Sequence, residues 1–173
     1  MPRPRVRPAT PDDLGLLVSH RRRMFEEMGE GSRADLDAAD PVYRRWARRK
    51  LRSGEMAAFV AEVGGARVAS GCVWLQPVQP RPGHPEGRQP YLLSMFTEPA
   101  HRGKGIAARI VKEAMRWSRA RGFARMALHA APMGRRVYRA LGFARTWEMK
   151  AKLSRRSSPA STTRSGSRSG SRT

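Results

Sequence analysis

The sequence is poor in cysteine, in acidic residues and in long apolar runs. Cys72 is the only cysteine, so an internal disulfide is excluded and a reducing cytoplasm is the expected location. No apolar run approaches the ~18 residues of a membrane span, and residues 1–10 lack the apolar stretch of a secretory signal. We therefore expect no membrane partner. The spacing of His20, His84 and His101 does not suit metal ligands, so we expect no metal site either.

Basic residues greatly outnumber acidic ones: 35 Lys and Arg stand against 14 Asp and Glu, for a formal net charge of +21. Such an excess favours non-specific binding to polyanions, although an arginine-rich composition with no binding role explains it as well. Residues 154–173 consist mainly of Ser, Arg, Gly and Thr and contain no acidic residue. We therefore predict one folded domain over residues 1–153 and a disordered tail over residues 154–173.

Hydrophobic periodicity and turn residues predict a mixed α/β domain. Alternating segments bounded by Gly and Pro are the expected strands, and segments with apolar residues every three or four positions are the expected helices. In chain order we expect a strand over 3–7, helices over 11–28 and 41–52, strands over 56–63, 67–75 and 91–97, a helix over 104–121, a strand over 123–129, a helix over 132–141 and a strand over 143–153.

The most informative segment joins a predicted strand to a predicted helix through a turn that contains Pro99. The helix opens on the run Arg102, Gly103, Lys104, Gly105, Ile106 and Ala107. Because glycine lacks a Cβ atom, this backbone can turn sharply and approach a ligand closely. Successive N–H groups at the positive end of a helix dipole then form an anion site that suits a pyrophosphate.

Three interpretations of this loop compete. The phosphate-loop NTPase pattern requires Ser or Thr after Gly-Lys, but Gly105 stands there. The dinucleotide-binding fingerprint is nearly matched, yet it requires an acidic residue about 20 positions farther on. Residues 122–125 contain none. A glycine-rich turn that merely caps a helix is the third interpretation.

A second motif adds specificity, since residues 137–143 read Val-Tyr-Arg-Ala-Leu-Gly-Phe. Together with the pattern Arg-x-x-Gly-x-Ala at 102–107, it resembles the acetyl-CoA motifs of the GNAT superfamily of N-acetyltransferases. The order of elements over about residues 3–153 resembles that superfamily too. The resemblance implies a mostly antiparallel central sheet, flanked by helices and splayed to hold CoA. It also implies an enzyme that transfers an acetyl group from acetyl-CoA, its cosubstrate, to a primary amine.

The resemblance further implies where the cosubstrate binds. The expected contacts are the strand residues Met95, Phe96 and Thr97 and the loop residues Arg102, Gly103, Lys104, Gly105, Ile106 and Ala107. A backbone N–H of the strand is expected to polarise the thioester carbonyl. Many members carry Asn near the position of His129, so that contact cannot be carried over to this chain.

Two side chains are the candidate catalytic groups. Tyr138 matches the tyrosine whose hydroxyl protonates the departing thiolate in the superfamily. Glu98, at the end of the predicted strand, is placed to accept the proton of the amine through water, but an exposed turn residue is the alternative. The acceptor site in such enzymes commonly borders the end of the first helix, where Glu26 and Glu27 lie.

Nothing in the sequence identifies the acceptor. A small-molecule amine is the expected one, and the alternative is a protein or peptide N-acetyltransferase that acts on a basic or ribosome-associated target. A protein that binds polyanions without catalysis is a third hypothesis. An acidic acceptor site would favour a small cationic amine, since a basic site would repel it. Either a monomer or a homodimer is compatible with the sequence.

Overall fold

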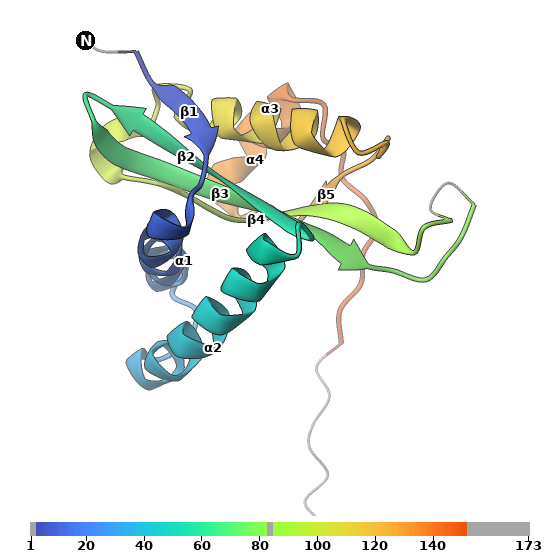
Figure 1. Ribbon diagram of the computed structural model, residues 1–173, viewed down its shortest axis with the longest axis horizontal. Helices are drawn as coiled ribbons and strands as arrows, with labels where there is room; N and C mark the ends of the chain where they lie inside the picture. Colours follow the sequence, from blue (N-terminus) through green and yellow to red (C-terminus); the bar gives the residue numbers. More distant parts are fainter. Residues whose placement is uncertain (1–2, 83–84, 152–173) are drawn as a thin grey trace, which may run out of the picture.

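The computed structural model describes residues 3–82 and 85–151, and its strands form one sheet covered by helices on both faces (Figure 1). The strand order is β1-β2-β3-β4-β5, and all neighbouring pairs are antiparallel except β4 with β5. The expected mixed, mostly antiparallel sheet is therefore confirmed. The strands are β1 (Arg5–Pro8), β2 (Met56–Val63), β3 (Ala66–Pro77), β4 (Arg88–Thr97) and β5 (Ala127–Leu128).

Helices α1 (Leu14–Met28) and α2 (Arg33–Arg52) lie on one face of the sheet, and α3 (Ile106–Arg119) and α4 (Arg135–Ala140) lie on the other (Figure 1). Each face of the sheet has its own hydrophobic core, and successive residues of β2 point alternately into one and the other. Phe59 and Ala61 belong to the cluster with α3, whereas Met56 and Ala58 pack with α1 and α2. Three short 3-10 turns complete the described elements: η1 (Pro11–Asp13), η2 (Pro99–His101) and η3 (Pro132–Gly134). Since both faces are covered, a ligand can reach the sheet only at strand ends and edges.

Helix α2 begins earlier than the sequence predicts, so a start at Pro41 is wrong. Its N-cap is Ser32, whose hydroxyl accepts a hydrogen bond from the backbone N–H of Asp35 at 3.2 Å. The Asp35 carboxylate in turn accepts the N–H of Ser32 at 2.9 Å. This capping box satisfies two donors of the first turn. Pro41 lies inside the helix at an exposed position, where water can bond the carbonyl that the proline leaves unpaired.

The end of the sheet is also shorter than predicted. The strand expected over 123–129 is reduced to Ala127–Leu128, and residues 143–151 of the strand expected over 143–153 form no strand. A strand needs a partner along its length, and β5 pairs with β4 only at these two residues. Residues 152–153 and the tail predicted over 154–173 lie outside the described residues.

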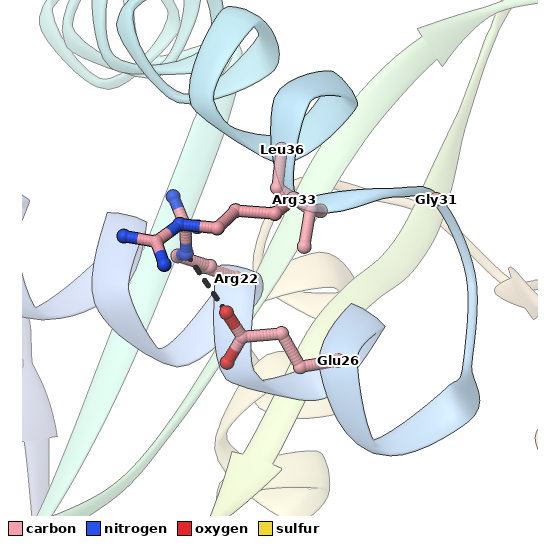
Figure 2. Close-up of a pocket in the computed structure, with 5 residues that line it drawn as sticks. All are labelled: Arg22, Glu26, Gly31, Arg33 and Leu36. Atoms are coloured by element: carbon pink, nitrogen blue, oxygen red, sulfur yellow. Dashed lines mark hydrogen bonds and ion pairs between the residues drawn. The ribbon is translucent and has the colours of Figure 1, made fainter.

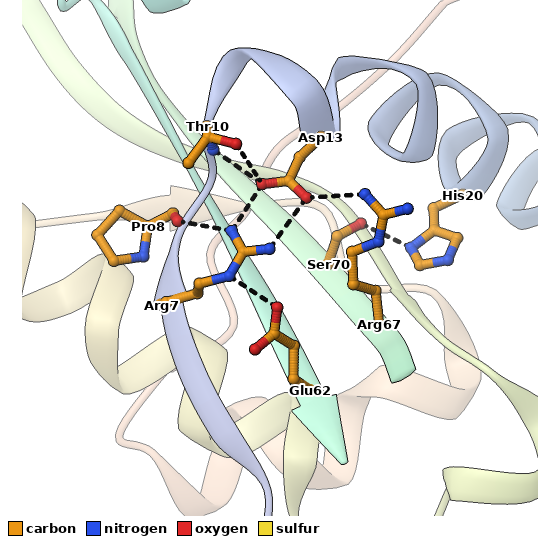
Figure 3. Close-up of polar contacts among 8 residues, drawn as sticks. All are labelled: Arg7, Pro8, Thr10, Asp13, His20, Glu62, Arg67 and Ser70. Atoms are coloured by element: carbon orange, nitrogen blue, oxygen red, sulfur yellow. Dashed lines mark hydrogen bonds and ion pairs between the residues drawn. The ribbon is translucent and has the colours of Figure 1, made fainter. Parts of the chain in front are cut away.

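A buried carboxylate ties the start of α1 to the edge of the sheet (Figure 3). The Asp13 side chain is 0% exposed, and Arg7 Nη1 on β1 donates to its Oδ2 at 2.6 Å. Arg67 Nη1 on β3 donates to the other oxygen at 3.2 Å. The backbone N–H of Thr10 supplies a further bond at 2.8 Å. These donors, with Arg7 first among them, hold the pKa of Asp13 well below its ordinary value even though burial opposes them.

Candidate active site

The loop between β4 and α3 has the geometry of an anion site. Gly103 and Gly105 both have φ of 75°, in the left-handed region that favours glycine. Gly105 is the N-cap of α3, and no side chain caps the helix there. A Cβ atom at either glycine would meet no atom within 4 Å, so the space beside this backbone is open. The residues present therefore fit a pyrophosphate, which would receive the uncapped N–H groups of the first turn.

The side chains of the loop are committed to contacts within the protein. Arg102 donates through Nε to the carbonyl of Thr97 at 2.8 Å and through Nη2 to both carboxylate oxygens of Glu27 at 2.7 and 2.8 Å. Lys104 donates to the carbonyl of Ala100 at 2.8 Å. An anion at this loop would therefore be bound mainly by backbone N–H groups. The Arg102–Glu27 pair also joins the loop to the last turn of α1.

Strand β4 bends and loses one neighbour before it reaches the loop. β5 pairs with it only at Tyr91 and Leu92, so residues 93–97 have a strand partner on the β3 side alone. Ser94 has φ of 52°, and the pairing with β3 shifts register there. Such a bulge bends a strand and re-aims its groups. The predicted contacts Met95 and Thr97 thus follow a bulge, in a part of β4 that β5 does not pair with. Their backbone edge on the β5 side is free to bind a ligand.

Glu98, at the end of β4, is held by groups of α1. Arg23 forms a two-pronged pair with it, in which Nη1 contacts Oε1 and Nη2 donates to Oε2 at 2.8 Å. His20 Nε2 lies 3.5 Å from Oε1, and His20 Nδ1 is hydrogen-bonded to the Ser70 hydroxyl at 2.9 Å. The hydrogen bonds from Arg23 lower the pKa of Glu98, whereas burial lowers the pKa of His20. Near neutral pH the site thus holds a carboxylate beside an uncharged imidazole.

Phe96 forms the apolar floor under these charges. Its side chain is buried, and its ring lies 4.8 Å from the ring of His20. The guanidinium carbons of Arg23 and Arg102 lie 4.7 and 5.6 Å from the Phe96 ring centroid. Such cation–π contacts fix both arginines in place. The sequence alone assigns no role to His20 or Arg23 in this site, because no local pattern links α1 to a strand end some 75 residues away.

Tyr138 lies on the opposite face of the sheet from the Arg23–Glu98 pair. It packs with Met95 against the core cluster of α3, and its ring meets that of Phe143 at 5.8 Å. Burial raises the pKa of the Tyr138 hydroxyl, so it is protonated at neutral pH. Its hydroxyl hydrogen-bonds to none of the described residues. The structure therefore places a protonated tyrosine hydroxyl on the α3 side of the sheet and a fixed carboxylate on the α1 side.

Acidic residues gather where α1 ends and α2 begins. Residues 26–40 contain six acidic residues and one arginine, a formal charge of −5 in a chain of +21; the six are Glu26, Glu27, Glu30, Asp35, Asp37 and Asp40. A pocket of about 460 Å³ lies there, lined by Arg22, Glu26, Gly31, Arg33 and Leu36 (Figure 2). Arg22 is paired with Glu26, Asp37 and Asp40 at 2.7–3.0 Å, so its charge is compensated. The pocket walls carry two arginines and one glutamate, so the acidic excess lies in the segment around the pocket and not in its lining.

No group of three His, Cys, Asp or Glu within residues 3–82 and 85–151 is arranged to hold a metal ion. Among the helices of those ranges, none combines the length and apolar character needed to cross a bilayer.

Comparison with known proteins agrees with this geometry. A sequence model described as the acetyltransferase (GNAT) family matches residues 20–143. A GCN5-related N-acetyltransferase from Ralstonia eutropha JMP134 is 32% identical, with a TM-score of 0.79 over 87% of this chain and 99% of that one. A protein from Clostridium acetobutylicum described as a predicted acetyltransferase, solved with acetyl-CoA, is 28% identical, with a TM-score of 0.79 over 87% and 96% of the two chains.

A more distant structure is the aminoglycoside N-acetyltransferase AAC(6')-Iy in complex with CoA, at 19% identity and a TM-score of 0.68 over 90% of this chain and 97% of that one. A similarity at this identity concerns the fold alone. No curated protein sequence matches significantly. The family match spans both the loop at residues 102–107 and Tyr138. The chain belongs to the acetyltransferase (GNAT) family, whose members transfer acyl groups from acyl-CoA to amines, with acetyl-CoA as the cosubstrate.

Proposed function

We propose that this acetyltransferase acts on a primary amine of a small cationic molecule. The observation that carries the proposal is the formal charge of −5 over residues 26–40, which is −3 when Arg22 and Arg102, the arginines paired with these residues, are included. An acidic rim of this kind attracts a cation that the remaining surface repels. The pair between Glu27 and Arg102 links the acidic rim to the loop over residues 102–107, where we expect the pyrophosphate to bind. Structures with the same fold include the aminoglycoside enzyme and a glucosamine-6-phosphate N-acetyltransferase, both of which take small amines.

The attack of the amine requires that the acceptor first lose a proton. We propose that a water molecule held by Glu98, the carboxylate at the end of β4, takes that proton. Since Arg23 lowers the pKa of Glu98, the carboxylate is a weak base that stays ionised. It serves by orienting the water and the ammonium group, and the proton then passes to bulk water.

Transfer also requires stabilisation of the carbonyl oxygen and a proton for the departing sulfur. We assign the first to a backbone N–H of residues 95–97, on the edge of β4 that β5 leaves unpaired. We assign the second to the Tyr138 hydroxyl, on the α3 side of the same strand. The amine nitrogen forms a bond to the acetyl carbon as the carbon–sulfur bond breaks, and Tyr138 supplies the proton that converts the thiolate to a thiol.

Replacing Tyr138 with phenylalanine should lower kcat about a hundredfold, at the low end for a general acid, because a thiolate leaves fairly well without a proton. The substitution keeps the ring contact with Phe143, so KM for acetyl-CoA and the melting temperature should stay nearly unchanged. Steady-state kinetics and thermal melts measure both. Wild-type turnover in Tyr138→Phe would reduce Tyr138 to a packing residue, and a large drop in melting temperature would make its hydroxyl structural.

The acidic rim is tested by replacing Glu26 with glutamine. If the rim attracts the acceptor, KM for a cationic amine should rise about three- to tenfold, while KM for acetyl-CoA stays constant. Added salt should raise the wild-type KM in the same direction. The matched control is Glu113→Gln on α3, which also breaks a surface pair with an arginine of its own helix and should change neither constant.

Equal KM values in wild type and Glu26→Gln would contradict an acidic acceptor site at this pocket. A preference for basic peptides over all small amines would favour the alternative, a protein or peptide N-acetyltransferase. Polyanion binding by the surplus of basic residues and a cytoplasmic location both stay predictions.

A further inference from the structure

Three side chains at the junction of β4 and β5 form a hydrogen-bonded triad that the proposed mechanism does not use. The hydroxyl of Tyr91, on β4, contacts Nδ1 of His129, the residue that follows β5. Nε2 of His129 lies 2.8 Å from Oε2 of Glu148. A hydroxyl, a base within reach of it and a third group that orients the base are the parts of a proton relay.

The carboxylate of Glu148 determines the direction in which the triad can move a proton. A carboxylate only accepts hydrogen bonds, so Nε2 of His129 carries the hydrogen that points to Glu148. In an uncharged imidazole Nδ1 is then the acceptor, and it receives the O–H of Tyr91. Burial, and then the charge of Glu148, raise the pKa of the Tyr91 hydroxyl, so Tyr91 does not stay ionised near neutral pH. Its oxygen can therefore take up a proton only as its own proton passes to His129.

The triad lies on the same face of the sheet as Glu98, at the point where β5 leaves β4. Strand β5 pairs with β4 at Tyr91 and last at Leu92. On its other side Tyr91 is opposite Trp74 of β3, and Trp74 packs with the cluster of α1 and α2. Directly paired residues point to the same face, and Glu98 also contacts α1. The triad is therefore next to the free edge of β4, whose N–H groups at 95–97 we assign to the thioester carbonyl.

Acetylation of an ammonium group removes two protons from its nitrogen, and the proposed mechanism accounts for only the first. That proton leaves before the attack, to the water held by Glu98. After the attack the nitrogen of the tetrahedral adduct is positively charged and still carries the second proton. Until this proton is removed, the neutral amine can leave again and the adduct reverts to acetyl-CoA. A second base beside the adduct would therefore speed the reaction.

We propose that Tyr91 takes this second proton and passes its own to His129. As the adduct nitrogen gives its proton to the Tyr91 oxygen, the hydroxyl proton of Tyr91 moves to Nδ1 of His129. The electron pair left on nitrogen forms the amide as the carbon–sulfur bond breaks, and the thiolate takes the proton of Tyr138. Glu148 stabilises the imidazolium, which returns its proton to water, since the side chains of His129 and Glu148 are 51% and 54% exposed. Tyr91 is thus a catalytic residue, and His129 and Glu148 act through it. The inference rests on acetyl transfer to an amine, but not on the charge of that amine.

Replacing Tyr91 with phenylalanine tests the relay, because it removes the hydroxyl and keeps the ring. With an amine that the wild type acetylates, kcat should fall about a hundredfold, the low end for a general base. KM for acetyl-CoA and the melting temperature should stay nearly unchanged. The matched control is Tyr43→Phe, which removes a hydroxyl of α2 that lies 4.0 Å from the Cys72 sulfur and should keep the wild-type kcat.

Variants of His129 separate proton transfer from a structural hydrogen bond. His129→Gln keeps a side chain that can hydrogen-bond but cannot hold an extra proton, so it should lose about as much kcat as Tyr91→Phe. The double variant should lose little more than either single one, because the two residues act as a unit. His129→Ala leaves a space open to solvent, where added imidazole should raise kcat about tenfold, and the same imidazole should not raise kcat of Tyr91→Phe.

Wild-type kcat in Tyr91→Phe or in His129→Gln would overturn the relay and leave acetyl transfer intact. A loss in His129→Ala that imidazole does not reverse would overturn His129 as the group that receives the proton. No thiol release by the wild type with any amine would contradict acetyl transfer itself, and the relay with it.

Discussion

Replacing Gly105 with valine should abolish acetyl-CoA binding and leave the fold intact. The Cβ atom of residue 105 would point into open space beside the N-terminus of α3, so it displaces no protein atom. That space is where a pyrophosphate would approach the uncapped N–H groups, and a branched side chain would fill it. We expect binding at least about a hundredfold weaker, which corresponds to ~2.7 kcal/mol.

The substitution also forces valine into left-handed backbone, so strain must be separated from loss of the site. Gly122 provides the control, because it follows the other end of α3 with φ of 83° and equally open surroundings. Gly122→Val should lower the melting temperature about as much as Gly105→Val while binding acetyl-CoA normally by calorimetry. Normal binding by Gly105→Val, or equal loss in both variants, would remove the pyrophosphate from this loop.

Replacing Asp13 with asparagine should destabilise the protein by about 3 kcal/mol, the lower end of the cost of breaking a buried ion pair. Asp13 is fully buried, and its loss would leave Arg67 without its partner and Arg7 with Glu62 alone. For a chain of this length, the loss corresponds to a melting temperature about 6–12 °C lower. Asp12→Asn is the matched control, since that neighbour is exposed and should change stability by no more than about 0.5 kcal/mol.

The stability that Asp13 contributes should decrease as the pH falls. Because the pKa of Asp13 is lowered in the folded state, its contribution is complete above the unfolded value of about 3.9 and is lost as the pH falls below it. The difference in melting temperature between wild type and Asp13→Asn should therefore be largest near pH 7 and should shrink toward pH 2. A difference that is independent of pH would show that shape, and not charge, stabilises this site.

Much of the sheet could be predicted from the sequence because its signals are local. The alternation over 56–63 and the turn at Gly64 and Gly65 predict the β2–β3 hairpin, and the structure confirms both strands. The glycine loop and the motif around Tyr138 likewise indicate the family without any tertiary contact. Where a capping box or a periodic apolar face determines an element, a single sequence contains the information.

Features that depend on distant contacts could not be predicted in this way. The strand expected over 143–153 has the right alternation, but whether it pairs depends on a neighbour that β5 is too short to provide. The role of Glu98 changes because Arg23, 75 positions earlier, reaches it across the end of α1. Residues 20, 23 and 98 have no common pattern, so only the fold brings them together.

One local signal in the sequence points to the bend of β4. Gly71 interrupts the apolar run of β3, and a Cβ atom there would collide with the Met95 sulfur and lie 2.8 Å from Ile110 Cγ2. A glycine inside a strand often marks a bulge or a close approach. Here it faces the bulge of β4 at Ser94 and makes room for Met95, so the bend of the binding strand could have been anticipated from that glycine.

The central claim, acetyl transfer to a small cationic amine, is tested most directly by the rate of thiol release from acetyl-CoA with a panel of acceptors. The panel should contain polyamines, aminosugar-type amines, neutral monoamines and basic peptides, with products identified by mass. We predict one added acetyl group, with kcat/KM rising with the positive charge of the small amine, and no activity in Gly105→Val. Activity confined to neutral amines or to peptides would contradict the cationic acceptor, and no thiol release with any amine would contradict the proposed reaction itself.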